Sequence, residues 1–313
     1  MEHSRATSRP WTAHHLWFGL FSIVSLLLFG RYLIALARLS LRDDRYSHIL
    51  LIPIISACLI YLQRRRIFTS PRFALLKSAP FLAAGAVLFC FAEMRLSALN
   101  SIDHLSVVVP AILLIWTAGF VFCYGTQVFR TALFPLFFLL LMIPVPTVAL
   151  EKIVVALQNG SAVMTYGLFK LFGVPVFWQH FKFLLPGVEI QIAEECSGIR
   201  SSSALFITSI LAGHLFLQSN WRRILFSLLT VPIVIFKNAL RIVTIASLGV
   251  YVDSSFLHGK LHQYGGLPFS LVSLAILVPA LLAFQKGERL PSAPARARTG
   301  IHTSSPLQPA VPK

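Results

Sequence analysis

The chain has 313 residues, of which 56% are hydrophobic and only 12% are charged, with a mean hydropathy of +0.76. Soluble domains carry about 25% charged residues, so this composition excludes a soluble globular domain and indicates a protein that crosses a lipid bilayer. The net charge of +16 does not indicate a nucleic-acid partner. The basic residues lie in short loops between apolar runs, as membrane topology requires, and not on one face among aromatics.

Eight apolar runs are long enough to cross a bilayer, which takes about 17–25 residues. They predict an all-α polytopic membrane protein with about eight transmembrane helices, at residues 16–36, 46–63, 79–94, 105–123, 131–148, 199–217, 224–249 and 266–284. Pro144 and Pro146 are expected to end the fifth span, because proline has no N–H to donate and clashes with the preceding turn. The first span is longer than the apolar stretch of a signal peptide, about 7–15 residues, so we expect a retained anchor.

The placement of charge predicts the orientation. If residues 1–15 are cytoplasmic, most of the 27 Lys and Arg residues lie on the inner side and most of the 11 acidic residues lie outside. The positive-inside rule therefore predicts that both ends of the chain are cytoplasmic. The tail at 286–313 is rich in Pro, Ala and Arg, so we expect it to be disordered. The transmembrane domain then covers residues 16–285.

One long connection, residues 149–195, precedes the sixth span on the predicted outer side. Its first part, 148–172, predicts one or two helices near the interface, interrupted at Gly160. Over 181–192 apolar side chains alternate with others on both sides of a Pro-Gly turn. A period of two is typical of strands, so we expect an outer segment with a short β-hairpin that leads directly into Cys196. The alternative is a re-entrant loop with a purely structural role.

Cys196 is the cysteine with polar neighbours, Glu194, Glu195 and Arg200, whereas the other three cysteines lie inside apolar runs. Four cysteines so placed do not form a disulfide framework. A helix that starts near Ser197 would favour the thiolate through its dipole and its free N–H groups. The two carboxylates act in the opposite direction. An activated thiolate at this position therefore needs positive partners.

Other polar residues are expected at the same membrane depth as Cys196. Arg241 lies far enough along the seventh span, at ~1.5 Å per residue, to reach the outer edge of a hydrocarbon core about 30 Å thick. Asn238 lies on the same helix face one turn earlier. His258 and His262 fall in the last outer loop, just before the eighth span. Ionisable groups are costly in a membrane, so their agreement in depth favours a functional site.

Each of these residues also has a simpler interpretation. Arg241 alone would fit an anchor that snorkels to the outer headgroups, and loop histidines are often exposed or cap helices. His258 and His262, four residues apart, would make a zinc site with Cys196. No further ligand accompanies them at metal-binding spacing, so we expect neither a metal nor a cofactor. We assign no chemistry to Lys237.

Five stretches resemble the exosortase family of membrane cysteine transpeptidases, which is linked with PEP-CTERM sorting signals. They are Tyr46–Pro53, Phe134–Pro146, Glu195–Ser201, Asn238–Ile242 and Leu261–Gly266. The resemblance covers about residues 40–285 with order and spacing kept, and it is most specific around Cys196. Ile49 departs from it, because the family usually has glycine there.

The resemblance implies a cysteine protease or transpeptidase with catalytic Cys196, Arg241 and His262. His258 is a rival for the histidine role, and the supporting residues would be Arg200, Asn238 and Glu195. The resemblance also implies a place in a bacterial cytoplasmic membrane with the site facing outward. Its partners would be the bilayer, membrane-anchored proteins with a C-terminal sorting signal, and an acceptor that the sequence does not identify. A link with exopolysaccharide and cell-surface export follows from the same family.

Two other classes fit some of the polar residues. A polysaccharide-export component or anion transporter would line an anion path with Arg200, Lys237 and Arg241. Its polar groups should then be spread through the depth of the membrane. A membrane acyltransferase would also form a thioester, but with a lipid acyl donor in place of a protein.

Overall fold

The structure is a computed structural model that describes residues 10–96, 98, 100–186, 188–192, 199–253 and 266–289. This part of the chain is mostly helical. In chain order the elements are α1 Pro10–Leu28, α2 Gly30–Arg42, η1 Asp44–Tyr46, α3 Leu51–Leu62, α4 Arg64–Ile67, α5 Leu75–Arg95, α6 Ser101–Thr131, α7 Leu133–Phe138, η2 Leu139–Met142, α8 Thr147–Leu171, β1 Phe177–Gln179, β2 Lys182–Leu185, β3 Val188–Gln191, α9 Ile199–Phe216, α10 Asn220–Leu228, α11 Thr230–Tyr251 and α14 Gly266–Arg289.

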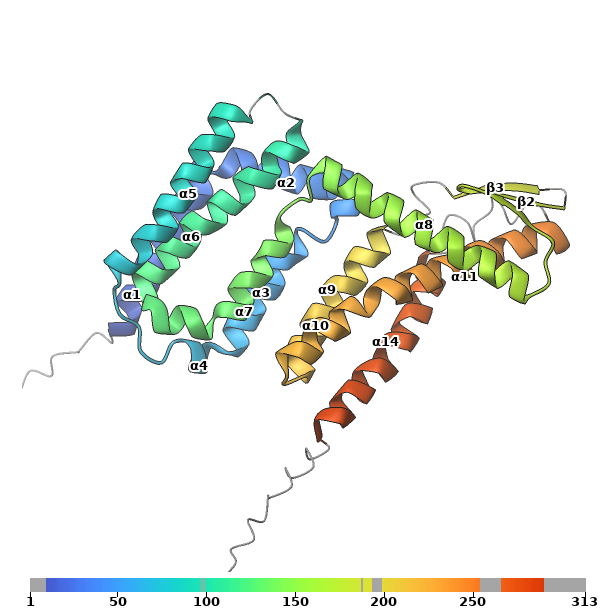
Figure 1. Ribbon diagram of the computed structural model, residues 1–313. Coiled ribbons are helices and arrows are strands. Elements are labelled where there is room, and N and C mark those ends of the chain that lie inside the picture. The colour runs from blue at the N-terminus through green and yellow to red at the C-terminus, as the bar shows by residue number, and fades with distance from the viewer. Residues whose placement is uncertain are drawn as a thin grey trace, which may run out of the picture.

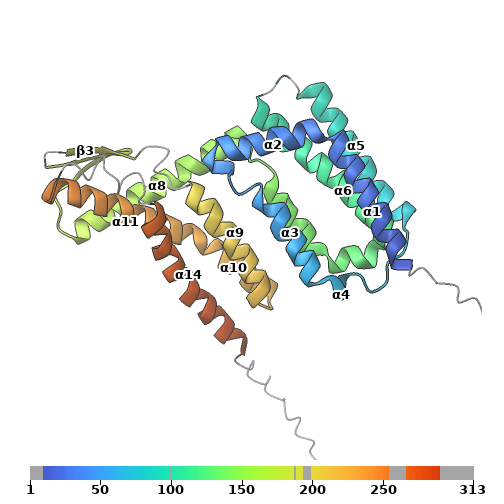
Figure 2. The ribbon, with the colours of Figure 1, turned by 180° about the vertical axis from the view of Figure 1, so that it is seen from behind.

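The helices form two groups joined by α8. Helices α1, α2, α5 and α6 make one group, with α3 and α7 beside it, and α9, α10, α11 and α14 make the other (Figures 1 and 2). Helix α8 reaches from the first group to the second, where it packs along α11. The three strands, which follow α8 in the chain, therefore lie beside the second group, to which α9 also belongs.

Within the described residues, five helical segments are long and apolar enough to cross a membrane, or up to seven if each of two bent pairs counts as one span. The five segments are Asp44–Leu62, Leu75–Arg95, Ser101–Thr131, Asn220–Tyr251 and Pro268–Glu288. An all-α polytopic membrane protein is thus confirmed, but the predicted number of eight spans is not reached. One reason is α9, whose apolar part, Ser201–Phe216, is shorter than a full span.

The predicted first span at 16–36 is wrong as a single straight helix. Helix α1 ends at Leu28, α2 begins at Gly30, and the two are bent by 73°. The reason is a change in pattern: α1 is mostly apolar after His15, whereas α2 buries Tyr32 and Leu36 on one face and carries arginines elsewhere. An amphipathic helix of this kind fits the membrane interface better than the hydrocarbon core.

The predicted fifth span ends where its prolines predict. Helical structure stops at Met142, Pro144 and Pro146 lie in the connection, and α8 starts at Thr147 after a bend of 89°. The predicted interruption at Gly160 is wrong, because α8 is continuous through it.

Gly160 serves close packing between α8 and α11. A Cβ atom built at this position would lie 2.8 Å from Cδ1 of Ile235 on α11. Such a distance is well inside normal van der Waals contact, so a larger side chain would force Ile235 to move. The glycine thus serves the contact with a neighbouring helix and does not break its own.

Three short strands follow α8 and form an antiparallel sheet in the order β1-β2-β3. The pair β2–β3, with Phe183 opposite Ile190, is the hairpin that the alternation over 181–192 predicts. Strand β1 was not predicted. Phe183 is fully buried and packs with Phe169 of α8 and Ile242 of α11. The sheet thereby holds the chain that leads toward α9 against these two helices.

The ends of the helices lie at two levels. The start of α1, the short helix α4 and the end of α14 lie at one end of the molecule, and α2 and the strands lie at the other (Figures 1 and 2). Helix α4 contains Arg64, Arg65 and Arg66. Segments predicted to be cytoplasmic thus share one end, and the side of the membrane that this end faces stays a prediction. Helix α14 extends to Arg289, so the tail predicted as disordered from 286 begins with helix, and its remainder lies outside the described residues.

Candidate functional site

A buried lysine joins α9 to α11. The Nζ atom of Lys237 on α11 donates a hydrogen bond to Oγ of Ser201 in the first turn of α9, at 2.5 Å. Lys237 is only 3% exposed. Within the described residues its partner is a hydroxyl and not a carboxylate. Burying an ammonium group with only a neutral partner is costly. This contact is therefore a candidate for a functional role.

The Lys237–Ser201 contact also sets the level of Arg241. Helix α9 runs from the end of the molecule that holds the strands toward the opposite end, and α11 runs back in the other direction (Figure 1). From this contact, one turn along α11 leads to Arg241, about 6 Å further at ~1.5 Å per residue. The same direction along α9 leads to Ile199, its first residue. Arg241 and the start of α9 therefore lie at the same level.

Asn238 is fully buried on the face of α11 that packs against α8. Its Nδ2 donates to Oγ of Ser161 at 3.0 Å. Ser161 is 1% exposed. Asn238 therefore joins α11 to α8, next to the lysine that joins α11 to α9. The structure brings both polar contacts into one turn of α11, and Arg241, which is half-buried, begins the next turn.

A third buried polar contact fixes the chain at the end of the sheet. Nε2 of Gln158 on α8 donates to the carbonyl oxygen of Ile192 at 3.2 Å. The N–H of Ile192 donates to the carbonyl oxygen of Phe181 at 2.8 Å. Gln158 and Ile192 are both buried. The last described residue before 193–198 is thus held by α8 and by its neighbour in the sheet.

The structure describes only part of the predicted site. Arg241 and Asn238 are placed on α11, and Arg200 is the second residue of α9, with its side chain outside the described residues. Cys196 and Glu195 lie in 193–198, and His258 and His262 lie in 254–265, also outside them. Within the part that is described, no group of three or more His, Cys, Asp and Glu side chains is arranged to hold a metal ion.

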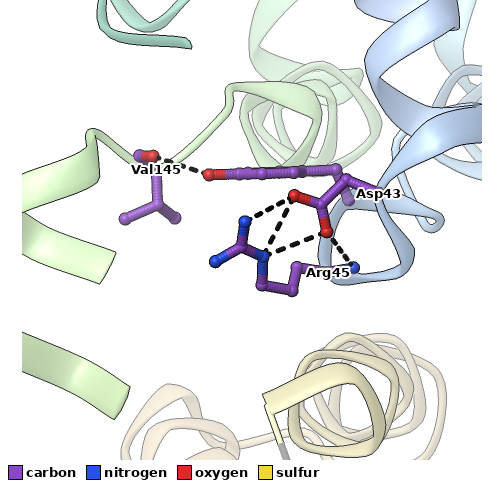
Figure 3. A network of polar contacts seen from close by, with 4 residues as sticks. Asp43, Arg45 and Val145 are labelled. Carbon is purple, nitrogen blue, oxygen red and sulfur yellow. Dashed lines mark hydrogen bonds and ion pairs between the residues drawn. The ribbon is translucent and has the colours of Figure 1, made fainter. Parts of the chain in front are cut away.

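The stretch Phe134–Pro146 is tied at two points to the first stretch and to the part of α3 that follows it. Oη of Tyr46 donates to the carbonyl oxygen of Val145 at 3.2 Å (Figure 3), and Oγ of Ser56 donates to the carbonyl oxygen of Pro135 at 2.8 Å. Beside Tyr46, Asp43 accepts hydrogen bonds from the backbone and guanidinium N–H groups of Arg45 (Figure 3). These bonds hold the pKa of Asp43 below its usual range.

The turn before α8 is held by α6. Oγ of Ser106 donates to the carbonyl oxygen of Pro144 at 2.8 Å. The carboxylate of Asp103 accepts from the N–H and the hydroxyl of Thr147, at 2.7 and 2.8 Å. A carboxylate at a helix N-terminus satisfies free N–H groups and interacts favourably with the helix dipole. Asp103 thus fixes the start of α8 from a separate helix.

The Tyr46 region also supports α9. The short helix η1 contacts α9, and Ile199 packs against the hydrophobic core that includes Tyr46 and Ile49. Ile49 is 1% exposed, so its side chain fills the core here. The first two stretches therefore act as a scaffold behind the start of α9.

Sequence reasoning missed Gln158, Ser161, Lys237 and Ser201 as parts of this arrangement. One signal was available: a lysine inside an apolar helix, one turn from Arg241, is a candidate for function by default. Gln158 and Ser161 also lie on one face of α8 at i, i+3 spacing. Their hydrogen-bond partners, Ile192 and Asn238, are distant in the sequence. The sequence therefore does not predict which residues pair.

These features define a multi-pass membrane protein with a cluster of buried polar groups where α8, α9 and α11 meet. A family model described as transmembrane exosortase matches residues 37–279, more than half of the chain. The chain belongs to this transmembrane exosortase family. No curated protein and no solved structure matches it.

Proposed function

We propose that the protein is a membrane-embedded cysteine transpeptidase that cleaves C-terminal sorting signals. The observation that carries this proposal is the family match over residues 37–279, a range that contains all five stretches named above. The catalytic domain would be residues 16–285, between the cytoplasmic segment 1–15 and the tail at 286–313. The enzyme would lie in a bacterial cytoplasmic membrane, with its site facing outward.

Cys196 is the proposed nucleophile. Its thiolate attacks a peptide carbonyl of the substrate, the amine leaves, and a thioester forms that an acceptor then resolves. Covalent catalysis of this kind divides a difficult acyl transfer into two easier steps. The position of Cys196 in the sequence supports the assignment, because it lies three residues before Ile199, where α9 begins. Glu195, its neighbour, would help to order the segment.

Arg241 and a histidine complete the proposed mechanism. Arg241 stabilises the oxyanion that forms when the carbonyl is attacked, a role in which preorganised charge is most effective. His262 exchanges a proton with the thiol and then protonates the leaving amine, and His258 remains the rival for this role. Arg200 orders the site or binds a carboxylate of the substrate. The level shared by Arg241 and the start of α9 supports this assignment.

The substrate would be a protein that spans the same membrane. We infer a C-terminal PEP-CTERM-type signal with a short motif, an apolar span and a basic tail, cut on the outer side. The released protein would pass to an acceptor in a process linked to exopolysaccharide and cell-surface export. The polar residues Lys237, Asn238 and Arg241 gather within two turns of α11 and are not spread along it. That distribution favours a local site over the anion path of a transporter.

The experiment is to replace the proposed nucleophile and follow substrate processing. Cys196→Ala should abolish conversion of a sorting-signal precursor, with enzyme abundance in membranes near that of the wild type. Cys58→Ala is the matched control, because Cys58 is an exposed thiol on the apolar helix α3. Processing by Cys196→Ala at the wild-type rate would refute the thioester mechanism.

A further inference from the structure

The buried contacts around α8 and α11 hold both ends of the segment that contains Cys196. Before the segment, Ile192 is bound by Gln158 of α8. After it, Ser201 is bound by Lys237 of α11. The two helices are themselves joined by the bond from Asn238, the residue next to Lys237, to Ser161. We call Gln158, Ser161, Lys237, Asn238 and Ser201 the buried polar frame.

The frame is built from groups that are expensive to bury. Gln158 is 5%, Lys237 3% and Asn238 0% exposed. Apolar side chains would pack α8, α9 and α11 at lower cost, since a buried polar group must recover the hydrogen bonds it loses to water. Hydrogen bonds, in contrast to apolar packing, fix direction and register. The cost is therefore understandable if the frame sets the position of what lies between its two ends.

We propose that the buried polar frame, and Lys237 in particular, is the positioning device of the site. It fixes Ile192 to α8 and Ser201 to α11, two described residues on either side of 193–198, and through them it would position Cys196 for reaction. Lys237 acts through Ser201 and does not touch the reacting atoms. This inference rests on the proposed function, which assigns the chemistry to Cys196.

The test uses the full chain in membranes, with Cys58, Cys90 and Cys123 replaced by serine so that Cys196 is the remaining thiol. Two quantities are measured: the kinetics of processing of a sorting-signal substrate, and the rate at which a maleimide alkylates Cys196. The variants are Lys237→Met, Lys237→Arg, Ser201→Ala and the double variant Lys237→Met/Ser201→Ala. Abundance and the thermal unfolding midpoint are recorded for each.

Lys237→Met should lower kcat about ten-fold or more, the effect of losing one hydrogen bond to a charged group, with KM nearly unchanged. Alkylation of Cys196 should become several-fold faster, because Ser201, five residues after Cys196, loses its bond to Lys237. Lys237→Arg should restore part of kcat, since guanidinium also donates to a hydroxyl. The loss in the double variant should be smaller than the product of the two single losses, because both single changes remove the Lys237–Ser201 bond.

Two control variants remove the same kinds of side chain, a serine hydroxyl and a lysine, at positions outside the Lys237–Ser201 contact. Ser203→Ala removes a hydroxyl that bonds only within α9, to the carbonyl oxygen of Ile199. Lys152→Met removes an exposed lysine of α8. Both should leave kcat and alkylation at the starting values.

The outcomes separate the inference from the proposed function. If Lys237→Met has the same kcat and the same rate of Cys196 alkylation as the protein without this change, the positioning role is wrong. Faster alkylation in Lys237→Met, together with normal processing by Cys196→Ala, would keep the frame and reject the thiol as nucleophile. If Ser201→Ala abolishes processing while Cys196→Ala retains it, Ser201 and Lys237 are a nucleophile and base pair, and the positioning role is wrong.

Discussion

Arg241 is the residue at which a membrane anchor and a catalyst have different requirements. An anchor needs a long cationic side chain, so lysine would replace it with little loss. An oxyanion partner needs the planar guanidinium, whose fixed donors lysine does not reproduce. We expect Arg241→Lys to accumulate normally but to lose ~100–1000-fold in turnover, as is typical for one preorganised donor. The measurement is the ratio of precursor to product, normalised to enzyme in membranes.

Full processing by Arg241→Lys would return this residue to the anchor interpretation. The histidines are compared in the same assay. His262→Ala should be as severe as Arg241→Lys, and His258→Ala should be milder. The reverse order would move the histidine role four residues back in the sequence, to His258.

At the scale of elements, Gly160 lies where α8 packs against Ile235 of α11. A leucine there would meet Ile235, and overpacking of this kind costs about 1–3 kcal/mol. Gly167→Leu is the matched change in the same helix, at an exposed position where a Cβ would meet nothing within 4 Å. We expect Gly160→Leu to lower the thermal unfolding midpoint and the rate of processing together. Gly167→Leu should stabilise slightly, since leucine is a better helix former than glycine.

Equal unfolding midpoints for the two leucine variants would show that α8 and α11 do not depend on this close approach. A loss of stability in Gly167→Leu alone would place the critical contact one to two turns further along α8.

Local patterns predicted the elements whose causes are local. Pro144 and Pro146 end a helix because of their own geometry, and the β2–β3 hairpin follows from an alternation within 181–192. The break between Leu28 and Gly30 was missed because the run at 16–36 is apolar on average. Gly160 was misread because its reason is Ile235, which lies on another helix.

The polar frame shows the same limit at the candidate site. Lys237 and Ser201 are 36 residues apart in the sequence, and Asn238 and Ser161 are 77 apart. Depth along a helix is a one-dimensional quantity, so the sequence predicts the depth at which Arg241 lies. Which side chains meet at that level depends on how helices pack, and no single segment encodes it.

At the scale of the whole molecule, the orientation in the membrane remains a prediction. It rests on the excess of basic residues in the segments expected inside; α4 and the end of α14, which belong to these segments, lie at one end of the structure (Figure 1). In a chain without its native cysteines, Ser254→Cys should react with an impermeant thiol reagent from outside intact cells, and Ser292→Cys should react only after lysis. Labelling of Ser292→Cys in intact cells would invert the orientation and place the proposed site in the cytoplasm.

The central claim is that an acyl group passes through the thiol of Cys196. Its most direct test is to trap that intermediate, by quenching the enzyme with a sorting-signal substrate in acid and analysing it by mass spectrometry. The account predicts a covalent adduct between Cys196 and the new C-terminus of the substrate, which hydroxylamine releases and which Cys196→Ala does not form. Rapid processing without any adduct, or an adduct that persists in Cys196→Ala, would contradict it.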